Sequence, residues 1–220
     1  MLPQATRKKQ TDIAAPRLPK RANIAELDTL GEQMTYTDLL IAEHELGDQV
    51  AEFVTFETTC FKQMAMQRAD LRGLRLADVR FEACDLADSS WENLSASRVE
   101  LLGCRLIGLQ AINGRVEDML IKGCNAVHAQ FWSTVFKRVR FESCNLSETN
   151  FQSADLAGVI FDKCDLRGAK MADAKLVGAD LRSSNLEGAR LGIKELQGAI
   201  VSIEQAVSIA RTLGVDVRLE

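Results

Sequence analysis

Apolar residues recur at every fifth position over most of this chain. From Phe56 to Leu191, all 28 residues at this spacing are apolar in a sequence of 220 residues. A period of five matches neither the 3.6-residue turn of an α-helix nor the two-residue alternation of a flat strand. It fits a short extended stretch followed by a corner, and four such sides would close a coil of about 20 residues. The spacing therefore predicts an all-β solenoid whose core is a stack of inward-facing side chains.

Five of the six cysteines support this coil length because they are spaced by twenty. They are Cys84, Cys104, Cys124, Cys144 and Cys164. Each lies two residues before an apolar centre, so we expect one interior column with Met64 below it and Ser184 above it. Packing of free thiols is favoured over a metal site, because this spacing matches no known ligand pattern. Cys60 directly precedes a centre, so it is expected to point outward and to be the most reactive thiol.

The composition divides the chain into four parts. Residues 1–33 contain all three prolines and a basic cluster, and are expected to form a largely disordered arm that is either a solvated tail or functional. Residues 34–53 keep the register and are expected to form a degenerate first coil or an N-terminal cap. The repeat occupies 54–193. In 194–220, Ser202 and Gln205 form a capping box and Gly214 stops the helix, which predicts a cap helix followed by a tail.

The repeat resembles a known family. The stretch Ala154-Asp155-Leu156-Ala157-Gly158 has the pattern of the pentapeptide repeat family, and the resemblance implies a right-handed quadrilateral β-helix of about seven to eight coils. The ending Gln205…Leu213-Gly214-Val215 is similar to that of the quinolone-resistance (Qnr) branch. That branch binds DNA gyrase and topoisomerase IV as a DNA mimic and dimerises through its C-terminus, so the resemblance implies a type II topoisomerase partner and a homodimer.

Enzymatic functions find no support in the sequence. His44 and His128 are far apart in the register, and no phosphate loop, dinucleotide fingerprint or metal-ligand spacing is present. We therefore expect no catalytic residues, cofactor or metal. The net charge of −4 predicts no direct binding of nucleic acid. The absence of a long apolar run or secretory segment predicts no membrane contact and a cytoplasmic location.

The functional information is expected on the outward positions of the rod. Six apolar residues are predicted outward and are candidates for binding a partner: Leu102, Ile107, Ile112, Leu120, Val127 and Trp132. Exposed apolar clusters often mark contacts. The other interpretation, which stays open, is that residues 22–53 cover them.

Two functions remain open at this point. The first is a non-enzymatic scaffold rod with an unknown protein partner, and the alternative is a topoisomerase-binding DNA mimic. Residues 54–191 contain 18 basic and 18 acidic residues, whereas mimicry requires an acidic surface. The apolar C-terminal segment predicts a homodimer, although a monomer with a folded-back tail is also compatible. The dimerisation candidates are Ile203, Val207, Ile209, Leu213, Val215, Val217 and Leu219.

Overall fold

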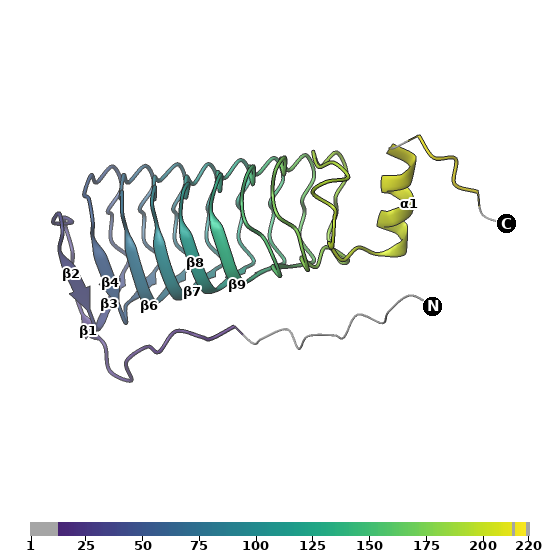
Figure 1. The fold of residues 1–220 in the computed structure, drawn as a ribbon. Coiled ribbons are helices and arrows are strands. Elements are labelled where there is room, and N and C mark those ends of the chain that lie inside the picture. The colour runs from purple at the N-terminus through teal and green to yellow at the C-terminus, as the bar shows by residue number, and fades with distance from the viewer. Residues whose placement is uncertain (1–12, 213, 219–220) are drawn as a thin grey trace.

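The computed structural model describes residues 13–212 and 214–218, and these residues form a rod of stacked coils with one helix at its end (Figure 1). Ten strands belong to one parallel sheet that winds along the rod. Their bounds are β1 Asn23–Ile24, β2 Thr35–Thr37, β3 Leu39–Ala42, β4 Thr55–Glu57, β5 Cys60–Lys62, β6 Arg75–Glu82, β7 Ser95–Leu102, β8 Arg115–Lys122, β9 Val135–Glu142 and β10 Ile160–Asp162.

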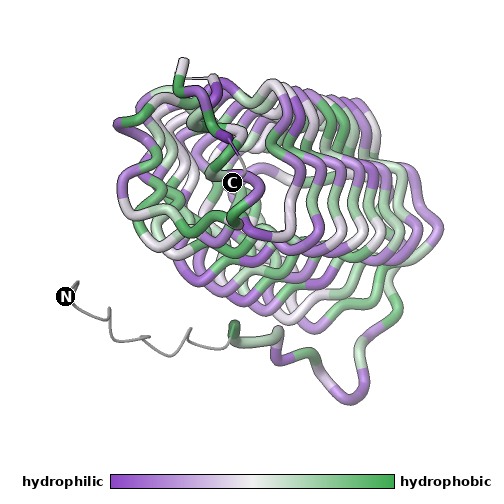
Figure 2. The backbone as a smooth tube through the Cα atoms, turned by 90° about the vertical axis from the view of Figure 1, so that its right-hand side faces the viewer, coloured by the Kyte–Doolittle hydropathy of each residue, from purple (hydrophilic) through white to green (hydrophobic). Residues whose placement is uncertain are grey.

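Strands of successive coils pair in parallel with a shift of 20 residues. Thr55 pairs with Arg75, Arg75 pairs with Ser95, and Ser95 pairs with Arg115. Isolated bridges such as Gln110↔Gln130 continue the same register on the shorter sides. The coils therefore superimpose when the rod is viewed from its end (Figure 2). The predicted all-β solenoid is confirmed, with about seven turns and one C-terminal helix.

The residues at the five-residue spacing form the core of the rod. Every centre from Phe56 to Leu181 is buried, and the last two, Leu186 and Leu191, are partly buried at the open end. Residues one coil apart stack face to face: the ring centroids of Phe61 and Phe81 lie 4.6 Å apart with an interplanar angle of 9°. The in-register pairing forces like side chains onto one another, so the sequence repeat becomes a set of interior columns.

The cysteine column has the predicted position. All five of its cysteines are buried free thiols, with Met64 and Ser184 buried in the same column. The thiols donate to carbonyl oxygens of the wall, as Cys124 Sγ does to Leu101 O at 3.4 Å. Ser184 Oγ makes the equivalent bond to Phe161 O at 2.8 Å. A small side chain with one donor therefore satisfies this slot.

The prediction for Cys60 was wrong. Its thiol lies in an outward slot, but the residue is only 9% exposed. Leu40 and Arg80 are its ladder neighbours on the adjoining coils, so their longer side chains project on the same face of the sheet as the thiol. Burial raises the pKa of the Cys60 thiol. A slot that points outward on one coil is thus closed by the side chains stacked above and below it.

The corners of the coils require a left-handed backbone. The second residue after a centre has a positive φ at these corners, which suits glycine, and Gly73 has a φ of 68° there. Many corners hold other residues in the same conformation, including Asp78 at 57° and Arg98 at 54°. Non-glycine residues adopt this conformation at a cost of about 1–2 kcal/mol each. The repeat tolerates them because pairing with both neighbouring coils determines the corner geometry.

Part of the N-terminal segment, for which composition predicts a largely disordered arm, lies along the rod. Residues 13–22 run extended beside the rod before β1 pairs with β3, as Figure 1 shows. The backbone N–H of Arg17 bonds to Asp78, and that of Ala14 bonds to Asp118. Residues 1–12 of the predicted arm lie outside the described residues. Composition indicated disorder here because the bonding partners lie 61 and 104 positions away.

The C-terminal helix α1 spans Ile203–Thr212 and begins at the predicted capping box. Ser202 Oγ accepts from the Gln205 N–H, and Gln205 Oε1 accepts from the Ser202 N–H. Gln205 Nε2 also donates to Leu181 O and Ser184 O, at 2.8 and 2.7 Å. These bonds set the rotation of the helix. Ile203, at the start of the helix, is 83% exposed and so does not cover the last coil.

Candidate interaction surfaces

The exposed apolar candidates divide between two sides of the rod. On one side, Ile107 precedes Val127 by one coil, and Ile112 precedes Trp132 by one coil. Trp132 is 45% exposed, whereas the other three are half-buried. We call these four residues the Trp132 patch. Residues 22–53 form the lead-in and the first coil, several coils away, so they do not cover the patch.

Leu102 and Leu120 do not belong to this patch. They lie on strands β7 and β8, where Leu102 pairs with Lys122 and Leu120 pairs with Glu100. Both leucines are half-buried among charged neighbours. The spacing along each column did not separate the two sides of the coil, so the sequence grouped all six residues together.

Charged residues form ladders between coils. Arg98 donates to both carboxylate oxygens of Asp78 at 2.6 Å. Arg138 does the same to Asp118 at 2.7 Å, and it also contacts Glu117. Because such pairs join residues 20 apart, each links one coil to the next. The acidic and basic residues of the rod are therefore paired with one another and are not separated onto different surfaces.

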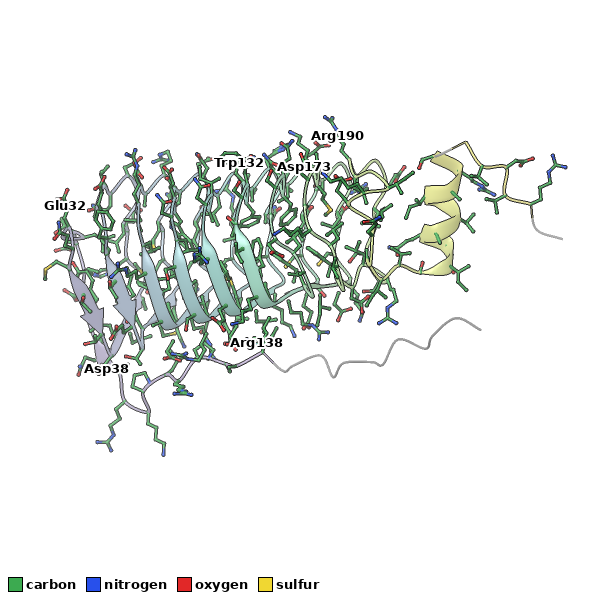
Figure 3. The ribbon with its side chains drawn as sticks, in the orientation of Figure 1. Glu32, Asp38, Trp132, Arg138, Asp173 and Arg190 are labelled. Carbon is green, nitrogen blue, oxygen red and sulfur yellow. The ribbon has the colours of Figure 1, made fainter. Side chains whose placement is uncertain are left out.

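One corner column carries the most buried of these pairs. Asp78, Arg98, Asp118 and Arg138 occupy equivalent corners of four successive coils, and we call them the Asp–Arg ladder. Asp78 and Asp118 are only 7% and 8% exposed. The Arg98 guanidinium, followed by the N–H of Arg17, holds the pKa of Asp78 below its usual value. Arg138 and the N–H of Ala14 lower the pKa of Asp118 in the same way. Figure 3 shows Arg138 and Trp132 on opposite edges of the rod.

A groove separates helix α1 from the last coil. It has a volume of about 490 Å³ and is lined by residues of both elements, among them Leu186, Leu191, Gln205 and Ile209. Of the dimerisation candidates, Ile203 and Val215 are exposed, and Val207, Ile209 and Val217 are half-buried. Leu213 and Leu219 lie outside the described residues. The end of the rod thus presents apolar side chains on both the groove and the outer face of the helix.

Residues 13–212 and 214–218 hold no cluster of three or more histidine, cysteine, aspartate or glutamate side chains arranged to bind a metal ion. His44 lies near the first coil and His128 lies on a corner four coils further along, so the structure does not bring them together. Over the same residues, no helix has the length and apolar character required to cross a bilayer.

Comparison with known proteins bears on the repeat itself. Residues 115–191 match the family model described as Pentapeptide repeat region. The same five-residue register extends through the coils on either side of this match. Residues 115–191 are a pentapeptide repeat region. No curated protein sequence matches this chain.

Several solved structures resemble this chain at low identity. A trypsin-treated variant of QnrB1, a plasmid-mediated fluoroquinolone resistance protein, is 22% identical, with coverage of 90% of this chain and 96% of that chain and a TM-score of 0.45. HetL from the cyanobacterium Nostoc, involved in heterocyst differentiation regulation, is 17% identical over 77% of this chain and 90% of that chain, with a TM-score of 0.49. A thylakoid-lumen pentapeptide repeat protein of Arabidopsis thaliana is 18% identical over 50% and 69%, with a TM-score of 0.32.

Proposed function

We propose that this chain is a non-enzymatic protein-interaction rod whose contact surface includes the Trp132 patch. The exposure of Trp132 carries the proposal, because this large aromatic side chain lies at an outward turn and is not part of the core cluster. Tryptophan is enriched among the residues that dominate binding energy at protein interfaces. Its column neighbour Ile112 and the adjacent pair Ile107 and Val127 extend the apolar area over two coils.

The rod geometry suits this role. Stacked coils form a stiff scaffold, since each coil is bonded to both neighbours through its backbone and its side-chain columns. A partner therefore meets a preformed surface and loses little free energy in ordering it. The patch fits a partner surface with two apolar strips and polar groups between them, because Gln110 and Gln130 lie between the two apolar columns.

DNA mimicry against a type II topoisomerase is the alternative function. It requires a surface on which negative charge runs uninterrupted along the rod. Here Arg98, Arg138 and their counterparts neutralise carboxylates one coil away. The pairing of charge thus favours a partner that recognises shape and apolar surface over one that recognises DNA-like charge.

We also infer a homodimer through the C-terminal segment. Ile203 and Val215 are exposed, and the last core residues Leu186 and Leu191 line an open groove. A two-fold interface would bury these surfaces together. Light scattering at about twice 24.3 kDa would support the dimer. The Ile203→Glu/Val215→Glu variant should then scatter as a monomer, whereas a wild-type mass near 24.3 kDa would contradict the inference.

Site-specific cross-linking tests the interaction function. An affinity-tagged form of the protein should retain a partner from cells of the source organism. A photoreactive phenylalanine analogue at position 132 should cross-link to that same partner in these cells. The matched control places the analogue at Val177, which is 63% exposed on another part of the rod. Trp132→Glu should reduce partner retention at least tenfold, and Val177→Glu should not. Equal capture from both positions, or unchanged retention by Trp132→Glu, would contradict the role of the patch.

A further inference from the structure

The Asp–Arg ladder has an occupant in this structure. Residues 13–19 cross it in an extended conformation, and we call them the strap. The N–H of Arg17 donates to Asp78 Oδ1 at 2.9 Å, and the N–H of Ala14 donates to Asp118 Oδ1 at 3.3 Å. Both bonds come from the backbone, so the ladder contacts peptide groups of the strap and not only its charges.

The spacing of the two acceptors matches an extended chain. Asp78 and Asp118 are two coils apart, which corresponds to about 9.6 Å at the spacing of paired strands. Ala14 and Arg17 are three residues apart, and three extended residues span about 10 Å. A polyproline II backbone has three residues per turn and rises about 3.1 Å per residue, so every third N–H faces the same side at intervals of about 9.3 Å. The ladder therefore presents carboxylates at close to the interval of the N–H groups of a polyproline II segment.

The orientation of the two carboxylates is fixed by the neighbouring arginines. Arg98 and Arg138 each bind both oxygens of one aspartate, which fixes the orientation of the carboxylate and leaves room on Oδ1 for a second donor. Asp78 and Asp118 are buried in the presence of the strap. Hydrogen bonds from peptide N–H groups to ionised carboxylates are stronger than neutral ones.

The strap itself is suited to a reversible contact. Pro16 and Pro19 restrict its backbone to extended conformations, so little conformational entropy is lost on docking. Ile13, Pro16 and Leu18 are half-buried, whereas Ala14, Ala15 and Arg17 are exposed. The charge of Arg17 also helps to lower the pKa of Asp78, after the bonds from Arg98 and from the Arg17 N–H. None of the described strap residues is fully buried, so the strap does not form part of the core.

We propose that the Asp–Arg ladder is a binding site for an extended, proline-containing basic peptide segment, and that the strap is its intramolecular occupant. A partner segment binds by replacing the strap and donating two N–H groups three residues apart to Asp78 and Asp118. This surface lies on the opposite edge of the rod from Trp132. A test of peptide binding to the ladder can therefore fail without affecting the proposed role of the Trp132 patch, and the reverse also holds.

Proline substitution in the full-length protein releases the strap without altering the ladder. Ala14→Pro/Arg17→Pro removes both N–H donors, and Ala15→Pro is the control because the N–H of residue 15 makes neither bond. Trypsin cleavage after Lys20 and Arg21 should become at least tenfold faster in the double variant and stay near the wild-type rate in the control. Continued protection of the double variant would contradict the proposed bonding.

A fluorescent synthetic peptide of residues 13–22 then serves as the probe. By fluorescence anisotropy, it should bind Ala14→Pro/Arg17→Pro at least tenfold more tightly than it binds wild type or Ala15→Pro, because a tethered occupant competes at high effective concentration. Asp78→Asn/Asp118→Asn in the released background should weaken this binding at least tenfold. Circular dichroism melts verify that each variant is folded.

An N-methylated peptide distinguishes backbone recognition from charge attraction. Methylation of the nitrogens of residues 14 and 17 removes the two donors while every charge is retained. This peptide should bind the released variant at least tenfold more weakly than the unmodified peptide. Equal binding of the two peptides, or no binding of either peptide to the released variant, would overturn the proposal.

Discussion

The N–H of Arg17 and the carboxylate of Asp78 form a 2.9 Å hydrogen bond across 61 positions of the sequence. Asp78 also accepts two hydrogen bonds from Arg98. Its carboxylate therefore links the N-terminal strap to two successive coils of the rod, its own coil and that of Arg98. The bond shows how a rod built from local repeats acquires a non-local element. It also makes that element sensitive to the ionisation of the carboxylate.

Acidification should loosen the strap and lower stability. The folded-state pKa values of Asp78 and Asp118 are below normal, chiefly through Arg98 and Arg138. Their stabilising contribution is therefore complete above the unfolded-state value of about 4 and is lost as pH falls through the lower folded values. Urea unfolding between pH 7 and pH 2 should show this loss. Asp78→Asn/Asp118→Asn should have a flatter profile below pH 4, and an identical profile would contradict the assignment.

The six thiols should resist labelling in the native protein. All are buried, and the pKa of Cys60 is raised by burial, which reduces the fraction of reactive thiolate. A maleimide reagent should modify less than one thiol per chain within minutes and all six in denaturant. Rapid labelling at Cys60 would show that its ladder neighbours do not protect it.

The cysteine column should accept serine more readily than a larger side chain. Serine preserves a donor for Leu101 O, as Ser184 preserves one for Phe161 O in the same column. Cys124→Leu should cost about 1–3 kcal/mol through overpacking of the narrow slot. Cys124→Ser should cost less, as measured by urea unfolding. A reversed order would indicate that the slot has more room than the stacked wall implies.

Removal of a stacked aromatic ring should destabilise the middle of the rod. Phe141 is buried, and its ring packs at 5.2 Å and 4° against Phe161 and at 6.1 Å against Phe151. Phe141→Ala should cost about 3–5 kcal/mol of unfolding free energy. The exposed control Val177→Ala should stay within about 0.5 kcal/mol of wild type. Calorimetry of the two variants provides the comparison.

Gln205 should control docking of α1 to the last coil. Its side chain caps the helix and donates to Leu181 O and Ser184 O. Gln205→Ala should increase amide exchange in α1 at least tenfold, since about 1–3 kcal/mol of hydrogen bonding is lost. Exchange in β6 to β9 should remain unchanged, because each repeat contacts only its neighbours. Faster exchange in both regions would show that the cap stabilises the whole rod.

The topoisomerase alternative predicts inhibition of DNA supercoiling by the host gyrase. The paired charges of the rod lead us to expect no inhibition at tens of micromolar protein. Half-maximal inhibition at or below one micromolar, abolished by charge-reversing substitutions on the rod, would favour the alternative over the scaffold function.

The core could be predicted from the sequence because each coil repeats the preceding one. A side chain at every fifth position faces inward wherever the coil continues, so burial from Phe56 to Leu181 follows from a local pattern. The cysteine column follows for the same reason, since a spacing of twenty returns to the same side. The capping box of Ser202 and Gln205 is also local and could be recognised within four residues.

Only the tertiary structure decided which surfaces remain free. The division of the outward apolar residues between two sides, the shielding of Cys60 and the exposure of Ile203 depend on contacts between coils or on the bonds of Gln205. The docking of the strap depends on Asp78 and Asp118, which no periodicity connects to Ala14 or Arg17. The repeat determines which side chains point inward because that is a property of the coil itself. Which outward side chains are covered depends on non-repeating segments, whose positions are set by long-range hydrogen bonds.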